Sequence, residues 1–161
     1  MLAICFFILC RAGDDAAGRP VIAIAGNQLE KALEQNLEKR LLLYAAREFG
    51  PLCRQRFTGL FIASGCRRVP GKRFARRLCA ALGPRHKENL KVLYLLHPPV
   101  QMRTAIAISS VISCGIPKGV FSKIALIDSL SMLERCGCND MELPKQAYEV
   151  NEKSRNSRSY Q

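Results

Sequence analysis

Short apolar runs separated by polar, turn-forming segments recur along the chain, and they predict strands. Residues 57–64 (FTGLFIAS) and 91–97 (KVLYLLH) are apolar at successive positions, which is typical of strands buried on both faces. Pro98-Pro99 removes two backbone donors and ends the second of these strands. Residues 123–128 (KIALID) supply a last strand.

The amino-terminal part of the chain has two further apolar runs. ICFFILC and PVIAIAG flank the Gly- and Asp-rich segment RAGDDAAGR, which predicts a hairpin over about residues 3–26. LAICFFILC has a second interpretation as a signal sequence. We favour a buried strand, because no basic residue precedes the run and it is shorter than the roughly 20 residues that span a bilayer.

Between the predicted strands, apolar residues repeat at helical spacing. From Leu29 to Ala45 they recur every four positions with charged residues between them, which predicts one amphipathic helix ended by Gly50-Pro51. Further helices are predicted over 74–82, over 100–112 and after an N-cap at Asp128 or Ser129. Strands and helices that alternate in this way predict a layered α/β domain with a mostly parallel sheet.

The charge of the chain adds an expectation about its partner. The length of 161 residues and the hydrophobic share of 48% fit one globular domain, but 25 Lys and Arg against 13 Asp and Glu leave a net charge of +12. The stretch 67–77 contains six Lys and Arg residues and no acidic residue. We therefore expect an anionic partner: a phospholipid surface, an acidic protein face or nucleic acid. Nucleic acid is disfavoured, since Phe74 is the one aromatic residue in the block that bases could stack on.

Candidate catalytic and metal-binding residues are few. The eight cysteines form no CxxC pair and there are two histidines, so we expect free thiols in a reducing compartment and no metal site. We find no Gly-rich phosphate loop and no HExxH motif, and we expect no cofactor. His97 has no recognisable nucleophile motif around it, so we expect its ring to bond neighbouring backbone. Enzyme activity is disfavoured.

Five motifs occur in order along the chain, and together they resemble the divergent CRAL-TRIO domain. They are DDAAGRPVIAI (14–24), RHKENLKVLYLLHPP (85–99), the helix from MRTAIAI, FSKIALIDSLSML (121–133) and ELPKQAYEVN (142–151). Domains of this kind occur in Rho GTPase-activating proteins, BCH-domain scaffolds and ganglioside-induced differentiation-associated proteins. The resemblance implies a three-layer α/β fold over residues 3–152, with 153–161 as a disordered polar tail. The chain departs from the pattern at Pro99, where relatives usually have Thr.

The resemblance also implies where a ligand would bind. The helix after His97 resembles the gate helix that borders the lipid cavity in this family, and its candidate lipid-binding residues are Met102, Ile106, Ser109 and Ile112. Core packing is the alternative, because a helix with little polar surface is normally buried. Candidate contacts to phosphate head groups or to an acidic partner come from the basic block: Arg67, Arg68, Lys72, Arg73, Arg76 and Arg77.

Two functions of different kinds follow from these observations. The first is a non-enzymatic lipid-binding or membrane-associating domain, with a phosphoinositide or another anionic phospholipid as ligand, in the cytoplasm or at the membrane periphery. The alternative is a protein-interaction module that binds a Rho-type small GTPase or its regulator. The resemblance to BCH domains implies this function. Reversing the basic charges should abolish liposome binding in the first case and leave partner capture largely intact in the second.

Overall fold

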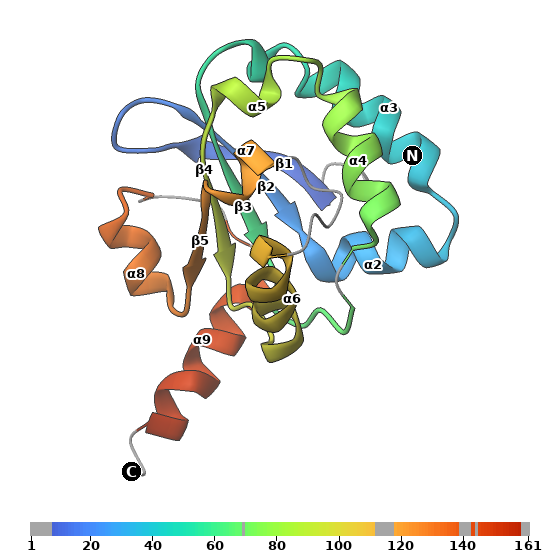
Figure 1. Cartoon of the computed structure of the whole chain (residues 1–161). Coiled ribbons are helices and arrows are strands. Elements are labelled where there is room, and N and C mark those ends of the chain that lie inside the picture. Colours follow the sequence, from blue (N-terminus) through green and yellow to red (C-terminus); the bar gives the residue numbers. More distant parts are fainter. Residues whose placement is uncertain (1–7, 69, 112–117, 139–142, 144, 159–161) are drawn as a thin grey trace.

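In the part of the chain that the structure describes, five strands form one sheet and lie in sequence order (Figure 1). The structure is a computed structural model that describes residues 8–68, 70–111, 118–138, 143 and 145–158. β1 (Leu9–Asp14) is antiparallel to β2 (Pro20–Ala25), and β2, β3 (Phe57–Ile62), β4 (Leu90–Leu96) and β5 (Ile124–Ile127) are parallel to one another. This confirms the predicted α/β class with a mixed, mostly parallel sheet.

The helices that connect the parallel strands lie on the same face of the sheet. Each connection leads to the next strand in the same direction, and right-handed crossovers then place every connecting helix on one side. These elements are α2 (Gly26–Glu34), α3 (Glu38–Glu48) and η1 (Leu52–Arg54) before β3, α4 (Lys72–Ala81) and α5 (His86–Asn89) before β4, and α6 (Val100–Val111) and α7 (Lys118–Phe121) before β5.

The opposite face of the sheet is covered by the two helices that follow β5. They are α8 (Leu130–Arg135) and α9 (Lys145–Arg158). Leu60 of β3 belongs to the core that includes Leu133 of α8 and Ala147 of α9. Its neighbour Phe61 points the other way and packs with Phe74 of α4 and Met102 of α6, because side chains alternate along a strand. The three-layer arrangement implied by the resemblance is confirmed.

The hairpin between β1 and β2 is held to the centre of the sheet by the buried side chain of Asp15. This carboxylate accepts hydrogen bonds from the backbone N–H groups of Ala17 at 3.0 Å and Arg19 at 3.1 Å, and from Arg19 Nε at 2.8 Å. Thr58 of β3 donates a further hydrogen bond at 2.7 Å. Burial raises the pKa of Asp15, but these hydrogen bonds outweigh it, so its pKa is lowered overall.

The segment from Leu29 to Ala45 differs from the single helix predicted for it. Two helices, α2 and α3, occupy the segment, and between them Asn36 adopts a φ of 57°, a left-handed conformation that Asn tolerates better than most residues. Positions four residues apart advance by about 40° per step around a straight helix, so the apolar stripe would have turned away from the sheet by Ala45. The break returns Leu41 and Ala45 to the core.

The beginning of α8 and the end of α9 can be compared with the sequence predictions. Ser129 is the N-cap of α8 and accepts a hydrogen bond from Met132 N at 3.3 Å, which confirms one of the two predicted caps. Helix α9 extends to Arg158 (Figure 1), so the structure differs from the predicted disordered tail over residues 153–158. No Gly or Pro interrupts this helix. Residues 159–161 lie outside the described part, and the domain bounds of 3–152 stay a prediction.

Candidate functional site

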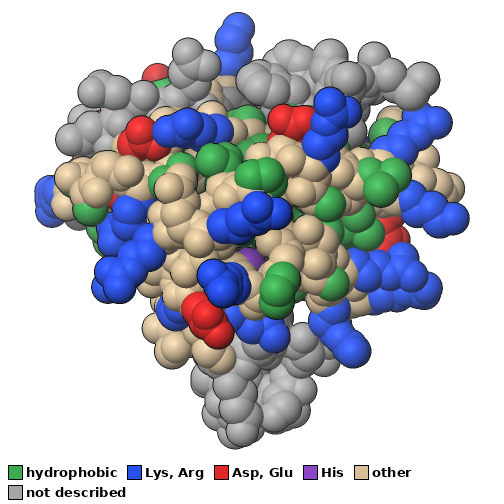
Figure 2. Space-filling view, turned by 90° about the horizontal axis from the view of Figure 1, so that it is seen from above, with side chains coloured by type: hydrophobic (Ala, Val, Ile, Leu, Met, Phe, Trp, Pro, Cys, Tyr) green, Lys and Arg blue, Asp and Glu red, His purple; other side chains and the backbone are tan. Residues whose placement is uncertain are grey.

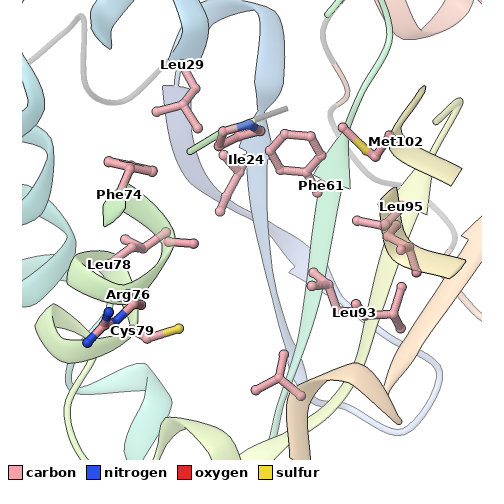
Figure 3. A pocket seen from close by; sticks show the side chains of 15 residues that line it. Ile24, Leu29, Phe61, Phe74, Arg76, Leu78, Cys79, Leu93, Leu95 and Met102 are labelled. Carbon is pink, nitrogen blue, oxygen red and sulfur yellow. The ribbon is translucent and has the colours of Figure 1, made fainter. Parts of the chain in front are cut away.

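An apolar cavity of about 210 Å³ lies over the connecting-helix face of the sheet, between α4 and α6 (Figure 3). The strands provide its floor, with Phe61 and Leu95 among the floor residues. Among the described residues, the lining consists of Ile24, Leu29, Phe61, Pro70, Phe74, Ala75, Arg76, Leu78, Cys79, Leu93, Leu95, Met102, Ile106, Val120 and Ile124. Because Arg76 is the only charged residue among them, the cavity suits an apolar group.

Helix α4 forms one wall of the cavity. Phe74 and Leu78 lie one turn apart, so they share the face that is turned to the sheet. Figure 3 shows the sulfur of Cys79 on the cavity side of this helix and the nitrogen atoms of Arg76 turned away from the cavity. Arg73 and Arg77 do not line the cavity. The helix therefore has an apolar inner face and a basic outer face, as its sequence pattern predicts.

Helix α6 forms the facing wall. Met102 and Ile106 lie one turn apart and both line the cavity; Met102 is buried and Ile106 half-buried. The helix begins directly after Pro98-Pro99, and the Pro99 carbonyl accepts hydrogen bonds from Met102 N and Arg103 N. The structure thus places two of the four predicted lipid-binding residues in the cavity wall. The side chain of Ser109 and the whole of Ile112 lie outside the described residues.

The residues of the basic block occupy α4 and the loop that leads into it. Arg77 forms an ion pair with Glu38 of α3 at 2.9 Å, and the Arg67 backbone N–H bonds to Glu30 at 3.0 Å. The remaining described members, Arg68, Arg73 and Arg76, have exposed side chains and take part in no ion pair among the described residues. The side chain of Lys72 is not described.

Basic side chains are also spread over one end of the molecule. Figure 2 looks down on the end where α5 lies, and Lys and Arg side chains there outnumber Asp and Glu side chains. This end of the molecule thus presents a surface on which basic side chains predominate. Such a surface attracts anionic partners over distances of about 10 Å at moderate salt.

The ring of His97 has a side-chain partner, which corrects the prediction that it bonds backbone. His97 Nδ1 lies 2.8 Å from Ser64 Oγ, while the His97 backbone N–H bonds to Ile127 O. Sequence reasoning missed Ser64, although it follows β3 as His97 follows β4, and the ends of neighbouring parallel strands meet at one edge of a sheet. Because Ser64 is only 2% exposed, its hydroxyl is not accessible as a nucleophile.

No disulfide links the described cysteines, which are Cys10, Cys53, Cys66, Cys79, Cys136 and Cys138. Burial lowers the nucleophilic character of several of these thiols. Burial raises the pKa of Cys53 to about 12 and that of Cys66 to about 11, with smaller contributions from the charges of Cys79 and Glu30 respectively. Burial also raises the pKa of Cys79, whereas the Lys87 ammonium acts in the opposite direction. The protonated thiol is the poorly reactive form.

Comparison with known families agrees with this geometry. The family model described as the divergent CRAL/TRIO domain matches residues 18–149, which is most of the chain. A search of curated proteins gave no match. Within the described residues no helix is long and apolar enough to cross a bilayer. CRAL/TRIO domains in general bind lipids and are non-catalytic. The chain belongs to the divergent CRAL/TRIO domain family.

Proposed function

We propose that this domain binds the apolar chain of a lipid in the cavity between α4 and α6. The observation that carries the proposal is the lining of the cavity, in which fourteen of the fifteen lining residues that the structure describes are uncharged and nearly all are apolar. An empty space with such walls has few polar groups to hold ordered water, so apolar atoms are its favoured occupants. Family membership supports lipid binding in general, and the apolar lining of the cavity supports it as the binding site.

The size of the cavity sets a condition on binding. A closed apolar cavity of about 150 Å³ admits one benzene ring, and pockets for larger ligands have about 300–1,000 Å³. The present 210 Å³ therefore accepts a short stretch of acyl chain. A full chain requires α6 or α4 to move outward. Helix α6 is the better candidate, because α4 also packs against α3, to which the Arg77–Glu38 ion pair holds it.

The basic outer face of α4 supports anionic phospholipids, phosphoinositides among them, as ligands or as the membrane surface. Each Lys or Arg near an anionic bilayer adds about 1 kcal/mol of attraction. Arg73 and Arg76 are exposed and have no ion-pair partner among the described residues, so both are available for such contacts. Peripheral association from the cytoplasmic side is the location consistent with this proposal.

Native mass spectrometry with lipid extraction tests the proposal. The protein is purified from a eukaryotic host, and a co-purified lipid or uptake from liposomes is expected as an added mass. Ile106→Trp places a large side chain in the cavity and should abolish this mass. Ile108→Trp is the matched control, because Ile108 lies on the same helix, is 50% exposed and does not line the cavity.

The outcome decides between lipid binding and core packing. An added lipid mass in the wild type and in Ile108→Trp, but not in folded Ile106→Trp, would support the proposal. A clean apo mass with no uptake from liposomes would contradict it and would make the α6 contacts ordinary core packing. The Rho-type GTPase or regulator then becomes the leading hypothesis, to be tested by partner capture with the basic residues reversed.

A further inference from the structure

A second, polar pocket adjoins the apolar cavity at the carboxyl end of α4. It has a volume of about 540 Å³ and lies between the last turns of α4, the turn at Gly83-Pro84 and α5. Its lining residues are Arg76, Cys79, Ala80, Gly83, Pro84, His86 and Lys87. Three of these side chains are cationic or can hydrogen-bond, in contrast to the walls of the cavity.

Two residues connect the pocket to the cavity. Arg76 and Cys79 line both spaces. In Figure 3 the Cys79 sulfur lies on the cavity side of α4, while the Arg76 nitrogen atoms point away from it. The Lys87 ammonium is close enough to influence the Cys79 thiol electrostatically. A molecule in the cavity would therefore have to extend past Cys79 to reach the charges of Arg76 and Lys87, which lie on the pocket side.

These charges are not neutralised within the described part of the chain. The ion pairs found there involve neither Arg76 nor Lys87. The nearest acidic residue in sequence is Glu88, whose side chain is exposed. Lys123 adds a third ammonium close by, since its Nζ donates to the Lys87 carbonyl at 2.6 Å. The local field therefore favours an anion.

His86 adds a more specific requirement. It is 6% exposed, and its Nδ1 bonds to the Gly83 carbonyl. Because a carbonyl can only accept, Nδ1 carries the proton, and in the neutral ring Nε2 is the lone-pair acceptor. Nε2 is buried and has no hydrogen-bond partner among the described residues. A buried polar atom of this kind calls for a partner, and a ligand hydroxyl in the pocket would supply one once the His86 ring turns Nε2 towards it.

We propose that the polar pocket binds a phosphate monoester that carries a free hydroxyl, as the head group of a lipid whose chain occupies the cavity. The phosphate lies between Arg76 and Lys87, and the hydroxyl donates to His86 Nε2. The chain of the lipid passes Cys79 into the apolar cavity. This inference rests on the proposed lipid binding for the position of the chain, whereas the anion site rests on the pocket alone. Free polyol phosphates have the same chemistry.

Calorimetric titration with three probes tests binding to the cavity and binding to the polar pocket separately. Monooleoylglycerol tests the cavity, glycerol 3-phosphate tests the pocket, and 1-oleoyl lysophosphatidic acid joins the two. We expect the lysophosphatidic acid to bind at least tenfold more tightly than the neutral lipid. Lys87→Gln and Arg76→Gln should each reduce that preference about fivefold. Lys31→Gln is the control, because Lys31 is exposed on α2 and lines neither space.

Each outcome bears on a different claim. Equal affinity for the charged and neutral lipids would overturn the head-group site while leaving lipid binding intact. Binding of glycerol 3-phosphate alone, lost in Lys87→Gln, would support the anion site as one for free polyol phosphates and contradict lipid binding. If no probe binds, both proposals fail. Finally, an oleoyl propanediol phosphate that lacks the hydroxyl should bind three- to tenfold more weakly, and unchanged affinity would overturn the role of His86.

Discussion

Arg103 of α6 forms an ion pair with Asp128, the residue that follows β5. Arg103 Nε also donates a hydrogen bond to the Pro98 carbonyl at 3.1 Å. The side chain thus ties the first turn of α6 to the carboxyl edge of the sheet. Because Met102 and Ile106 project from the same helix into the cavity, this tie holds one wall of the cavity in place.

Removing these two interactions of Arg103 should make local unfolding of α6 more frequent. Both charged partners are more than a third exposed, so each interaction contributes only about 0.5 kcal/mol. Their joint loss in Arg103→Ala should raise amide exchange across residues 100–111 about fivefold. Hydrogen exchange with mass spectrometry measures this change. Arg135→Ala removes an exposed charge of α8 as a control, and an equal effect there would show that Arg103 holds nothing in particular.

The hydrogen bonds of Asp15 predict a large effect on stability. Asp15→Asn neutralises the carboxylate that accepts hydrogen bonds from Thr58 and Arg19. We therefore expect the free energy of unfolding to fall by about 2 kcal/mol in urea titrations at pH 7. Asp14→Asn is the control, because its ion pair with Arg11 is exposed and contributes less than about 1 kcal/mol. Equal losses in the two variants would contradict the structural role of Asp15.

The lowered pKa of Asp15 gives this effect a pH dependence. A carboxylate with a lowered pKa stabilises the fold fully above its unfolded value of about 3.9, and loses that contribution as the pH falls through the folded value. The difference in unfolding free energy between wild type and Asp15→Asn should therefore shrink below about pH 4. A difference that stays constant from pH 7 to pH 3 would argue against an ionised Asp15.

The break between α2 and α3 depends on the left-handed conformation of Asn36. Asn36→Ala should lower the free energy of unfolding by about 1 kcal/mol, because a Cβ without a polar group is disfavoured there. Asn36→Gly should change it by less than about 0.5 kcal/mol, since Gly adopts positive φ freely. Gln35→Ala, one residue earlier at φ −84°, is the control. Thermal or urea unfolding that ranks Ala above Gly at position 36 would contradict the assigned conformation.

The sequence predicted those parts of the fold that depend on burial pattern. Strands β3 and β4 were predicted correctly, since buried parallel strands are apolar at almost every position. The break at Asn36 was missed, because one residue's backbone conformation is decided by the packing of two helices and leaves no periodic signal. The helix in residues 153–158 was missed because polar composition alone does not distinguish an exposed helix from a disordered tail.

The site was predictable only in part for a related reason. Met102 and Ile106 came from the resemblance of the segment after His97, and the inner face of α4 from the spacing of Phe74 and Leu78. The pairing of His97 with Ser64 depends on two strands being neighbours, and the sequence does not state strand order. The polar pocket depends on the turn at Gly83-Pro84, which brings α5 back against the last turns of α4.

His97 makes stability depend on pH near neutrality. Burial lowers its pKa, and the charge of Asp128 and the side chain of Asn151 oppose this only in part. As the pH falls, a histidine whose pKa is lowered by folding takes up a proton in the unfolded state before it does so in the folded state. Its contribution to the free energy of unfolding is therefore complete above its unfolded pKa of about 6.5, and it is lost as the pH falls towards its pKa in the folded state. We therefore expect the Tm of the wild type to fall between pH 7 and pH 5.

His97→Asn separates this titration from the geometry of the site. Asn tolerates the φ of 52° at this position and removes the titrating ring, so the Tm of the variant should change less between pH 7 and pH 5 than that of the wild type. Ser64→Ala is the control, because it removes the 2.8 Å contact and keeps the ring. It should lower the Tm at both pH values and retain the pH dependence. An equal decrease with pH in wild type and His97→Asn would show that another group causes it.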